Sequence, residues 1–470
     1  MASLYFLFYT TIVIKTASTF SLSAVDGRYS SKTAPLADIF SESNLITNRL
    51  KIEIDFLLFL SKKKLTRNLT NTEKRKLLSL KKLTPKQILE IKKIENKTHH
   101  DVKAVEYFLR NQIKNSSLKD LSPYIHIGLT SEDINNLAYR LMVKDGLQDV
   151  LIPELIKAIK NLTSLAEKHI DQPILARTHG QGAIPTTFGK EIAVFINRLI
   201  PLLNELHSQK LKGKLNGAVG GYQALSIAFP KKNWLKLNKE FVKSYDLEFL
   251  EISTQINPQD DLVILFQKLF HINQVLIGLN QDLWRYVSDD WLLQKNEKSH
   301  VGSSTMPQKI NPIEFENSEG NLKMANGMFQ VFIQNFTISR LQRDLSDSTI
   351  QRNIGTSFGH CLLAYQSLNK GLEKIEINKK QIKVDLNKNW NILAEAAQTM
   401  ARKNGDDKAY EKIAEISKNQ TATKEDWQKI VKNIDKNLLE LNPENYLGLS
   451  KQITKNVINK SHKLIRKVQQ

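Results

Sequence analysis

The segment from Ser299 to Asn321, SHVGSSTMPQKINPIEFENSEGN, concentrates side chains that can do acid–base chemistry. Ser303 and Ser304 follow a glycine, and Lys309 and Asn311 stand between two prolines. Glycine frees the backbone and proline excludes regular structure, so these residues predict a mobile functional loop that carries a base, a cation and an amide. A plain Ser/Gly/Pro connector between two helices is the alternative on these residues alone.

The sequence KTHHDVKAVEYFL places His99, His100 and Asp101 at the start of an expected helix. The first turn of a helix has unpaired N–H groups and a favourable field for anions, which suits Asp101. Adjacent histidines cannot face the same way on a helix. We therefore expect one of them to be structural and assign His100 to a site.

Thr130 and Ser131 precede Glu132 and Asp133 in HIGLTSEDINN, which is typical of a helix N-terminus with acids in its first turn. A good N-cap explains Ser131 completely. It does not require Thr130 or the two asparagines that follow, so Thr130 and Ser131 are kept as candidate binding residues.

Other polar candidates lie in four further segments. Asp26-Gly27 predicts a turn that presents Arg28 and Tyr29, and a plain loop arginine and a contact to phosphate or carboxylate are equally good interpretations. His179 lies in the loop RTHGQ, and histidine is the residue type suited to giving and taking protons near neutral pH. Gln255 is the notable polar group of a long connector, and the segment 340–353, RLQRDLSDSTIQRN, is rich in arginine.

The composition is that of a globular protein with a basic surface. The chain has 470 residues, 41% hydrophobic and 25% charged, with 68 Lys and Arg against 48 Asp and Glu, a net charge of +20. The excess is scattered lysine without arginine or aromatic interleaving, which favours a solvated surface over a nucleic-acid site. One cysteine, Cys361, excludes an internal disulfide and a zinc cluster of cysteines, and favours a reducing compartment.

The first twenty residues contain an apolar run from Leu4 to Ile14. A bilayer needs about 20 apolar residues, and a secretory signal needs positive charge before its apolar run, whereas Lys15 follows this one. We interpret residues 1–20 as an atypical apolar leader and expect no membrane-spanning helix elsewhere.

Five later segments repeat leucine and other apolar residues at alternating steps of three and four. This spacing predicts long helices that pack side by side at shallow angles. The segments are 151–165, 188–206, 262–286, 322–336 and 354–375. We expect an all-α fold with three helical domains: 21–120, a central five-helix bundle at 121–375, and 376–470.

The length of these helices separates the candidate loops. Helices of about 20–30 residues run about 30–45 Å. If neighbouring helices alternate in direction, the serine loop and the segment 340–353 lie at opposite ends of the bundle. A site that uses both would borrow residues from another subunit.

The motif GSSTMPQKINP resembles the signature loop of the fumarase/aspartase superfamily. Within it, six separated motifs are similar to the adenylosuccinate lyases in their longer bacterial form, across roughly residues 23–450. They are VDGRY, THHDVKAVEYFL, TSEDINN, RTHGQ, the serine loop continued through NPIEFENSEGN, and RDLSDSTIQRN. The resemblance implies elimination of fumarate from adenylosuccinate, giving AMP, and from succinylaminoimidazole carboxamide ribotide, giving AICAR.

Breaking a C–N bond beta to a carboxylate needs a base for the carbon-bound proton, a stabiliser for the enolate-like carboxylate and an acid for the nitrogen. The resemblance implies Ser303 as base and His179 as acid, with His100 in support. It also implies a set of substrate contacts, whose arginines suit phosphate and succinyl carboxylates. These are Arg28, Tyr29, His99, Asp101, Thr130, Ser131, Gln255, Ser304, Lys309, Asn311, Asn317, Arg343, Ser348, Thr349 and Arg352.

The resemblance further implies a cytoplasmic homotetramer whose active sites are assembled from three chains, with no metal or organic cofactor and with neither nucleic acid nor membrane as partner. The sequence departs from the family pattern at Gly182, at Gln308, and in GGYQAL, where Gly221, Gln223 and Leu225 replace the residues of GNYNAH. Two other readings stay open: another fumarate-releasing enzyme such as argininosuccinate lyase, and a catalytically silent basic scaffold.

Overall fold

The computed structural model describes residues 20–295, 306, 309–417, 423–432 and 434–469 of the 470-residue chain. They separate into two compact units, each built from three stretches of sequence. Unit 1 comprises 1–153, 206–271 and 323–363, and unit 2 comprises 154–205, 272–322 and 364–470. The expected division into three domains at residues 120 and 375 uses a different criterion and stays a prediction.

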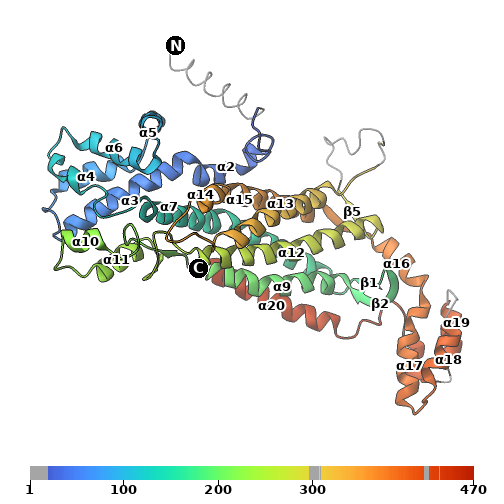
Figure 1. Cartoon of the computed structure of the whole chain (residues 1–470). Coiled ribbons are helices and arrows are strands. Elements are labelled where there is room, and N and C mark those ends of the chain that lie inside the picture. The colour runs from blue at the N-terminus through green and yellow to red at the C-terminus, as the bar shows by residue number, and fades with distance from the viewer. Residues whose placement is uncertain (1–19, 296–305, 307–308, 418–422, 433, 470) are drawn as a thin grey trace. The chain divides into compact units, whose positions relative to one another are not determined.

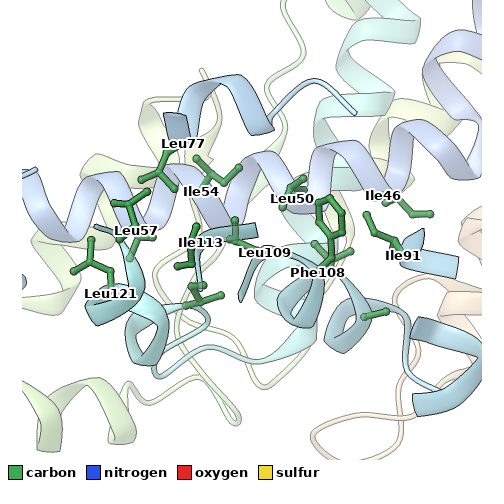
Figure 2. Close-up of a cluster of buried hydrophobic side chains, with 14 of the residues drawn as sticks. Ile46, Leu50, Ile54, Leu57, Leu77, Ile91, Phe108, Leu109, Ile113 and Leu121 are labelled. Atoms are coloured by element: carbon green, nitrogen blue, oxygen red, sulfur yellow. The ribbon is translucent and has the colours of Figure 1, made fainter. Parts of the chain in front are cut away.

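Unit 1 begins with six α-helices, and the middle four of them enclose an apolar core. They are α2 (Ser30–Phe40), α3 (Glu42–Lys62), α4 (Asn71–Leu80), α5 (Pro85–Thr98), α6 (Asp101–Ile113) and α7 (Ser131–Asp145). The helices α3 to α6 lie together in the blue part of Figure 1. Figure 2 shows why: one face of α3, with Ile46, Leu50 and Ile54, meets Phe108 and Leu109 of α6. Burying each such side chain contributes about 1.5–3 kcal/mol.

The five segments with three-and-four spacing are all helical, as predicted. They form α8 (Ile152–Lys168), α9 (Phe188–His207), α12 (Asp260–Ser288), α13 (Ile313–Asn335) and α15 (Ile354–Lys374). Cys361 is fully buried on α15 and is a core residue. The all-α fold is therefore confirmed.

The strands are short and serve as joints between helices. Strand β1 (Pro173–Thr178) pairs with β2 (Gln181–Thr187) as an antiparallel hairpin, and β5 (Leu292–Gln294) pairs antiparallel with β6 (Ile375–Ile377). The connector of unit 1 contains β3 (Lys212–Gly213) beside β4 (Glu248–Phe249) in parallel. The same connector contains two helices, α10 (Gln223–Ala228) and α11 (Trp234–Lys243).

The remaining helices belong to the later part of the chain. In unit 1, α14 (Ser346–Gln351) precedes α15. In unit 2 the C-terminal helices are α16 (Lys379–Asn387), α17 (Ala394–Lys403), α18 (Ala409–Ser417), α19 (Lys424–Val431) and α20 (Ser450–Gln469). The chain after residue 375 is therefore helical, as expected.

One described helix, α12, is long and apolar enough to cross a membrane, but 61% of its most apolar window is buried inside the protein. A core helix of a bundle passes the same test of length and composition. Of the expected leader, residues 1–19 lie outside the described part of the chain.

Candidate active site

The junction of α5 and α6 directs the two adjacent histidines differently. His99 ends α5 in the left-handed conformation, with φ of 55°, and His100 is the N-cap of α6. The Nδ1 atom of His100 accepts a hydrogen bond from the Lys103 N–H at 3.2 Å, which satisfies one unpaired donor of the first turn. This capping leaves Nε2 to face another element, and the assignment of His100 rather than His99 to a site stays a prediction.

The Nε2 atom of His100 lies 3.4 Å from the hydroxyl oxygen of Ser131 at the start of α7. The N-cap of α7 is Thr130, whose N–H donates to the Asp133 carboxylate at 2.9 Å, and Ser131 is the first helical residue. The expectation that Ser131 is the cap was therefore wrong by one position. Because Thr130 does the capping, the Ser131 hydroxyl can contact His100.

Asp101 is held by Arg49, a residue that sequence reasoning missed. One guanidinium nitrogen of Arg49 donates to Asp101 at 2.6 Å and another donates to Asn135 of α7 at 2.9 Å. Burial alone raises the pKa of the Asp101 carboxyl, but the Arg49 charge and the Val102 N–H outweigh it, so the pKa lies below its usual range. The one sequence signal was an arginine on the apolar face of α3.

Two small cavities in unit 1 adjoin these residues. The first, about 290 Å³, is lined by Arg49, Asp101, Tyr139 and Arg352 among others, and it joins candidates from α6 and from the end of α14. The second, about 250 Å³, is lined by Asp26, Arg352 and residues of α2. Arg352 therefore lies between the α6 candidates and the turn that precedes Arg28.

Behind the first turn of α7 lies a group of buried charges. Asp133 accepts from the Lys214 ammonium at 2.9 Å and from the backbone N–H groups of Asn216 and Gly217 at 3.0 Å each, and both charged side chains are fully buried. Its neighbour Glu132 is also buried. The Asp133 carboxylate thus fixes the connector to α7.

Glu132 and Arg343 are the closest charged pair between α7 and the segment 340–353. An Nη1 of Arg343 lies 3.4 Å from one oxygen of Glu132. Burial raises the pKa of the Glu132 carboxyl to about 7, against the opposing charges of Lys214 and Arg343. The structure thus brings Arg343 to the helix turn that begins with Ser131.

The other candidates of that segment have local roles in the described structure. The Ser348 hydroxyl donates to the adjacent Asp347 carboxylate at 3.4 Å, and the Thr349 carbonyl accepts from Asn353 at 3.2 Å. Burial raises the pKa of Asp347, which also accepts from Gln259 at 3.0 Å. Missed at the sequence level, Asp347 and Gln259 join α14 to the connector before α12.

In unit 2, His179 lies at the tip of the β1–β2 hairpin. Its φ of 52° and the φ of 77° at Gly180 are those of a two-residue type I′ turn, between the paired Thr178 and Gln181. Arg177 anchors the hairpin: its Nε lies 3.5 Å from Asp289, and its guanidinium carbon lies 5.6 Å from the centre of the Trp291 ring. The imidazole is therefore presented on the exposed tip of an anchored hairpin.

Ser303 and Ser304 lie outside the described residues, so the geometry of the serine loop is untested. Of the loop's other candidates, Lys309 is exposed and Asn311 is partly buried. Asn317 lies within α13, where its side-chain oxygen accepts from Ser367 at 2.8 Å. Asn317 thus has a packing partner inside unit 2.

The structure therefore brings together His99, His100, Asp101, Thr130, Ser131, Arg343 and Arg352 as parts of unit 1. It places His179, Lys309, Asn311 and Asn317 in unit 2. Arg28 lies 5.9 Å above the ring of Tyr29 at the start of α2. The Gln255 amide donates to the Ala218 carbonyl at 2.8 Å and so holds the connector.

The sequence departures in the connector are built into its packing. Leu225 is fully buried against Gly128, and its carbonyl accepts from the Trp234 indole at 2.9 Å. At Gly221, a Cβ would lie 2.5 Å from the side-chain amide nitrogen of Gln223. Leu225, which stands in place of the histidine of GNYNAH, is thus an apolar core residue.

Among the described residues, no group of three or more His, Cys, Asp or Glu side chains could hold a metal ion. The seven unit 1 candidates supply two imidazoles, two hydroxyls, a carboxylate and two guanidinium groups. This set suits a small anionic ligand that carries phosphate or carboxylate groups.

Comparison with known proteins agrees with this chemistry. A family model described as lyase matches residues 27–328, and one described as adenylosuccinate lyase C-terminal matches residues 339–447. Adenylosuccinate lyase from Legionella pneumophila strain Corby is 41% identical, over 93% of this chain and 98% of the relative. The Escherichia coli K12 adenylosuccinate lyase is 37% identical, over 91% and 96%.

Solved structures match the fold. A fumarate lyase from Mesorhizobium superposes with a TM-score of 0.76 at 18% identity, over 90% of this chain and 97% of that one. A 3-carboxy-cis,cis-muconate lactonizing enzyme from Pseudomonas putida gives a TM-score of 0.76 at 19% identity, over 91% and 97%. At these identities the likeness concerns the fold alone.

Proposed function

This chain belongs to the adenylosuccinate lyase family, and on that premise we propose how its residues divide the elimination of fumarate from adenylosuccinate, which leaves AMP. The protein is a carbon–nitrogen lyase. The observation that carries this function is identity of 37–41% along more than nine tenths of both chains. By the same chemistry, succinylaminoimidazole carboxamide ribotide is a second substrate, which gives AICAR.

Ser303 takes the carbon-bound proton beta to the nitrogen, and Lys309 supplies positive potential for its alkoxide. The electrons of the C–H bond form the double bond of fumarate while the C–N bond breaks. His179 gives a proton to the departing nitrogen. The exposed hairpin tip supports this role, because an imidazole there can approach a bound ligand.

Residues of unit 1 bind the substrate. His100 and Ser131, 3.4 Å apart, contact the succinyl group, and Arg343 and Arg352 pair with its carboxylates and the phosphate. The cavity beside Asp101 and Arg352 supports the assignment, since both side chains line it. The other substrate contacts are the remaining residues of the set given in the sequence analysis.

The active enzyme is a homotetramer whose sites combine residues of several subunits. Large apolar side chains on three long helices support association, because each is between 42% and 56% exposed in the single chain. They are Val194 of α9, Ile264 and Trp284 of α12, and Met324 and Val331 of α13. The compartment is the cytoplasm, consistent with a single buried cysteine.

The first experiment compares two succinyl compounds. The purified protein is incubated with adenylosuccinate and, separately, with argininosuccinate, and fumarate release is followed. We expect turnover of adenylosuccinate alone. Release from argininosuccinate instead identifies the rival enzyme, and release from neither, with a folded oligomer verified by light scattering, removes both readings.

The second experiment tests the division of labour. Ser303→Ala and His179→Gln should each lower kcat by about 10²–10⁴-fold, the range for loss of a general base or acid. Mixing the two inactive variants and letting subunits exchange should restore part of the activity, because some mixed sites then contain both intact residues. No recovery in exchanged tetramers would mean that each site takes Ser303 and His179 from the same subunit.

A further inference from the structure

Glu132 lies directly behind the candidate substrate contacts. It follows Ser131 on the first turn of α7, and it is 2% exposed. A carboxylate removed from water loses its hydration and needs replacement partners. A buried Glu132 is therefore costly unless nearby groups pair with its carboxylate.

The two carboxyl oxygens of Glu132 differ in their surroundings. One lies 3.4 Å from Nη1 of Arg343, and the other is buried without a hydrogen-bond partner among the described residues. The nearby charges that act on it are Lys214, Arg343, Arg140 and Asp347. Of these, only Arg343 forms a hydrogen bond with Glu132 in the described structure.

Arg343 belongs to a segment that has few apolar contacts to hold it. Ile338, Leu341 and Leu345 are all more than 60% exposed, whereas the Arg343 side chain is only 19% exposed. The contact with Glu132 thus ties this segment to α7. A guanidinium has five N–H donors, so a single contact leaves donors for a bound anion.

The length of the contact also suits a ligand. Tight pairs between charged groups are about 2.7–2.9 Å long. The pair of the buried Glu73 with the partly exposed Arg67, in the same unit, has that length at 2.8 Å. Since the Glu132 contact is longer, it orients the Arg343 guanidinium and leaves this group able to pair with a ligand.

We propose that Glu132 is a positioning residue that orients the Arg343 guanidinium toward the anionic group of the substrate. This inference rests on the proposed function, in which Arg343 is a substrate contact. It assigns Glu132 a role in affinity that acts through Arg343. The carboxylate neither touches the substrate nor takes part in proton transfer.

The test is a double-mutant cycle with adenylosuccinate as substrate and intact tetramer as enzyme. Arg343→Ala removes the contact and should raise KM about tenfold or more. Glu132→Gln keeps the shape but removes the charge, and it should raise KM severalfold with kcat within about twofold. In the Arg343→Ala background, Glu132→Gln should raise KM no further, because its effect passes through Arg343.

A matched control and a second variant complete the design. Glu73→Gln removes another buried acid paired with an arginine and should leave KM unchanged. Glu132→Asp keeps the charge but withdraws the carboxylate by about 1.5 Å, one C–C bond, and should also raise KM. It takes the place of Glu132→Gln if that variant does not fold.

The outcomes separate the two assignments. If Arg343→Ala leaves KM unchanged, Arg343 is no substrate contact, and that part of the proposed function fails together with this inference. If Arg343→Ala raises KM and Glu132→Gln either leaves it unchanged or raises it equally in both backgrounds, the proposed function stands and Glu132 does not position Arg343.

Discussion

Helices α4 and α7 both begin with a capping box, and the two boxes use their acids differently. The Thr70 N–H donates to Glu73, and the Thr130 N–H donates to Asp133, each at 2.9 Å. The Glu73 carboxylate also accepts hydrogen bonds from Arg67, six residues away in sequence. Asp133 accepts a hydrogen bond from Lys214, 81 residues away in sequence. The capping box of α4 therefore makes only local contacts, whereas that of α7 also fixes a distant connector.

The acids of the two regions also differ in how completely they are paired. Arg67 and the Thr70 backbone lower the pKa of Glu73 below its usual range. Burial raises the pKa of Glu132, whose one hydrogen bond, to Arg343, is long. The α4 region is thus arranged for stability, whereas the α7 region keeps a buried carboxyl incompletely satisfied next to candidate substrate contacts.

The largest effect is expected from Asp133→Asn. The substitution leaves the Lys214 ammonium buried without its counter-charge and turns an amide toward backbone N–H donors. The free energy of unfolding should fall by about 3–5 kcal/mol, measured by urea denaturation. Asp120→Asn, on the exposed partner of Arg67, is the control and should cost under about 1 kcal/mol. Equal losses would mean that the buried pair with Lys214 contributes no more to stability than an exposed ion pair.

Glu132→Gln should change how stability depends on pH. Because the folded-state pKa is about 7 and lies above the usual value, the folded protein binds more protons than the unfolded chain between those two values. Wild-type stability therefore falls as the pH rises through this window. Relative to wild type, the variant should gain about 3 kcal/mol between pH 5 and pH 8, from about 1.4 kcal/mol for each pKa unit. A flat difference across this range contradicts the prediction.

Glu73→Gln should show the opposite pH dependence. Its lowered folded-state pKa stabilises the protein above the pKa of the unfolded chain, and this contribution is lost as the pH falls. The variant should lose about 2 kcal/mol near pH 7, typical of hydrogen bonds to a charged group. The loss should shrink below about pH 4. A loss that stays constant down to pH 3 argues against the pairing with Arg67.

Thr70→Ala should have the smallest effect. It removes the side-chain acceptor of the Glu73 N–H but leaves the Arg67 pair in place. An N-cap threonine contributes about 1 kcal/mol, to be measured by thermal unfolding. Thr84→Ala, at the start of α5, removes a capping box of the same kind and should cost about the same. A cost above about 2 kcal/mol at Thr70 alone would mean that its hydroxyl does more than cap.

Local chemistry explains what the sequence predicted well. The five long helices follow from apolar spacing, and His100 was placed at a helix N-terminus by the neighbouring Asp101. The cap of α7 was missed by one residue, because Thr130 and Ser131 are equally good caps and boundaries shift by one or two positions. Patterns of single residues thus located the elements and most of the candidates.

Long-range pairing explains what the sequence could not predict. Lysine is almost never fully buried, so nothing in LKGKLNG signals that Lys214 lies in the interior beneath Asp133. Arg49 and Asp101 are 52 residues apart and become partners only when α3 packs on α6. Such contacts depend on tertiary packing, which leaves no periodic pattern in the sequence from which the partners could be predicted.

The left-handed conformation of His179 has a consequence for protein engineering. A residue with a Cβ is disfavoured at a φ of 52°, and glycine or asparagine suits this turn better. Redesign that optimises backbone preference alone would therefore replace the histidine and produce a firmer hairpin. That redesigned hairpin would lack the imidazole assigned to donate the proton, so thermal tolerance and turnover pull in opposite directions at this position.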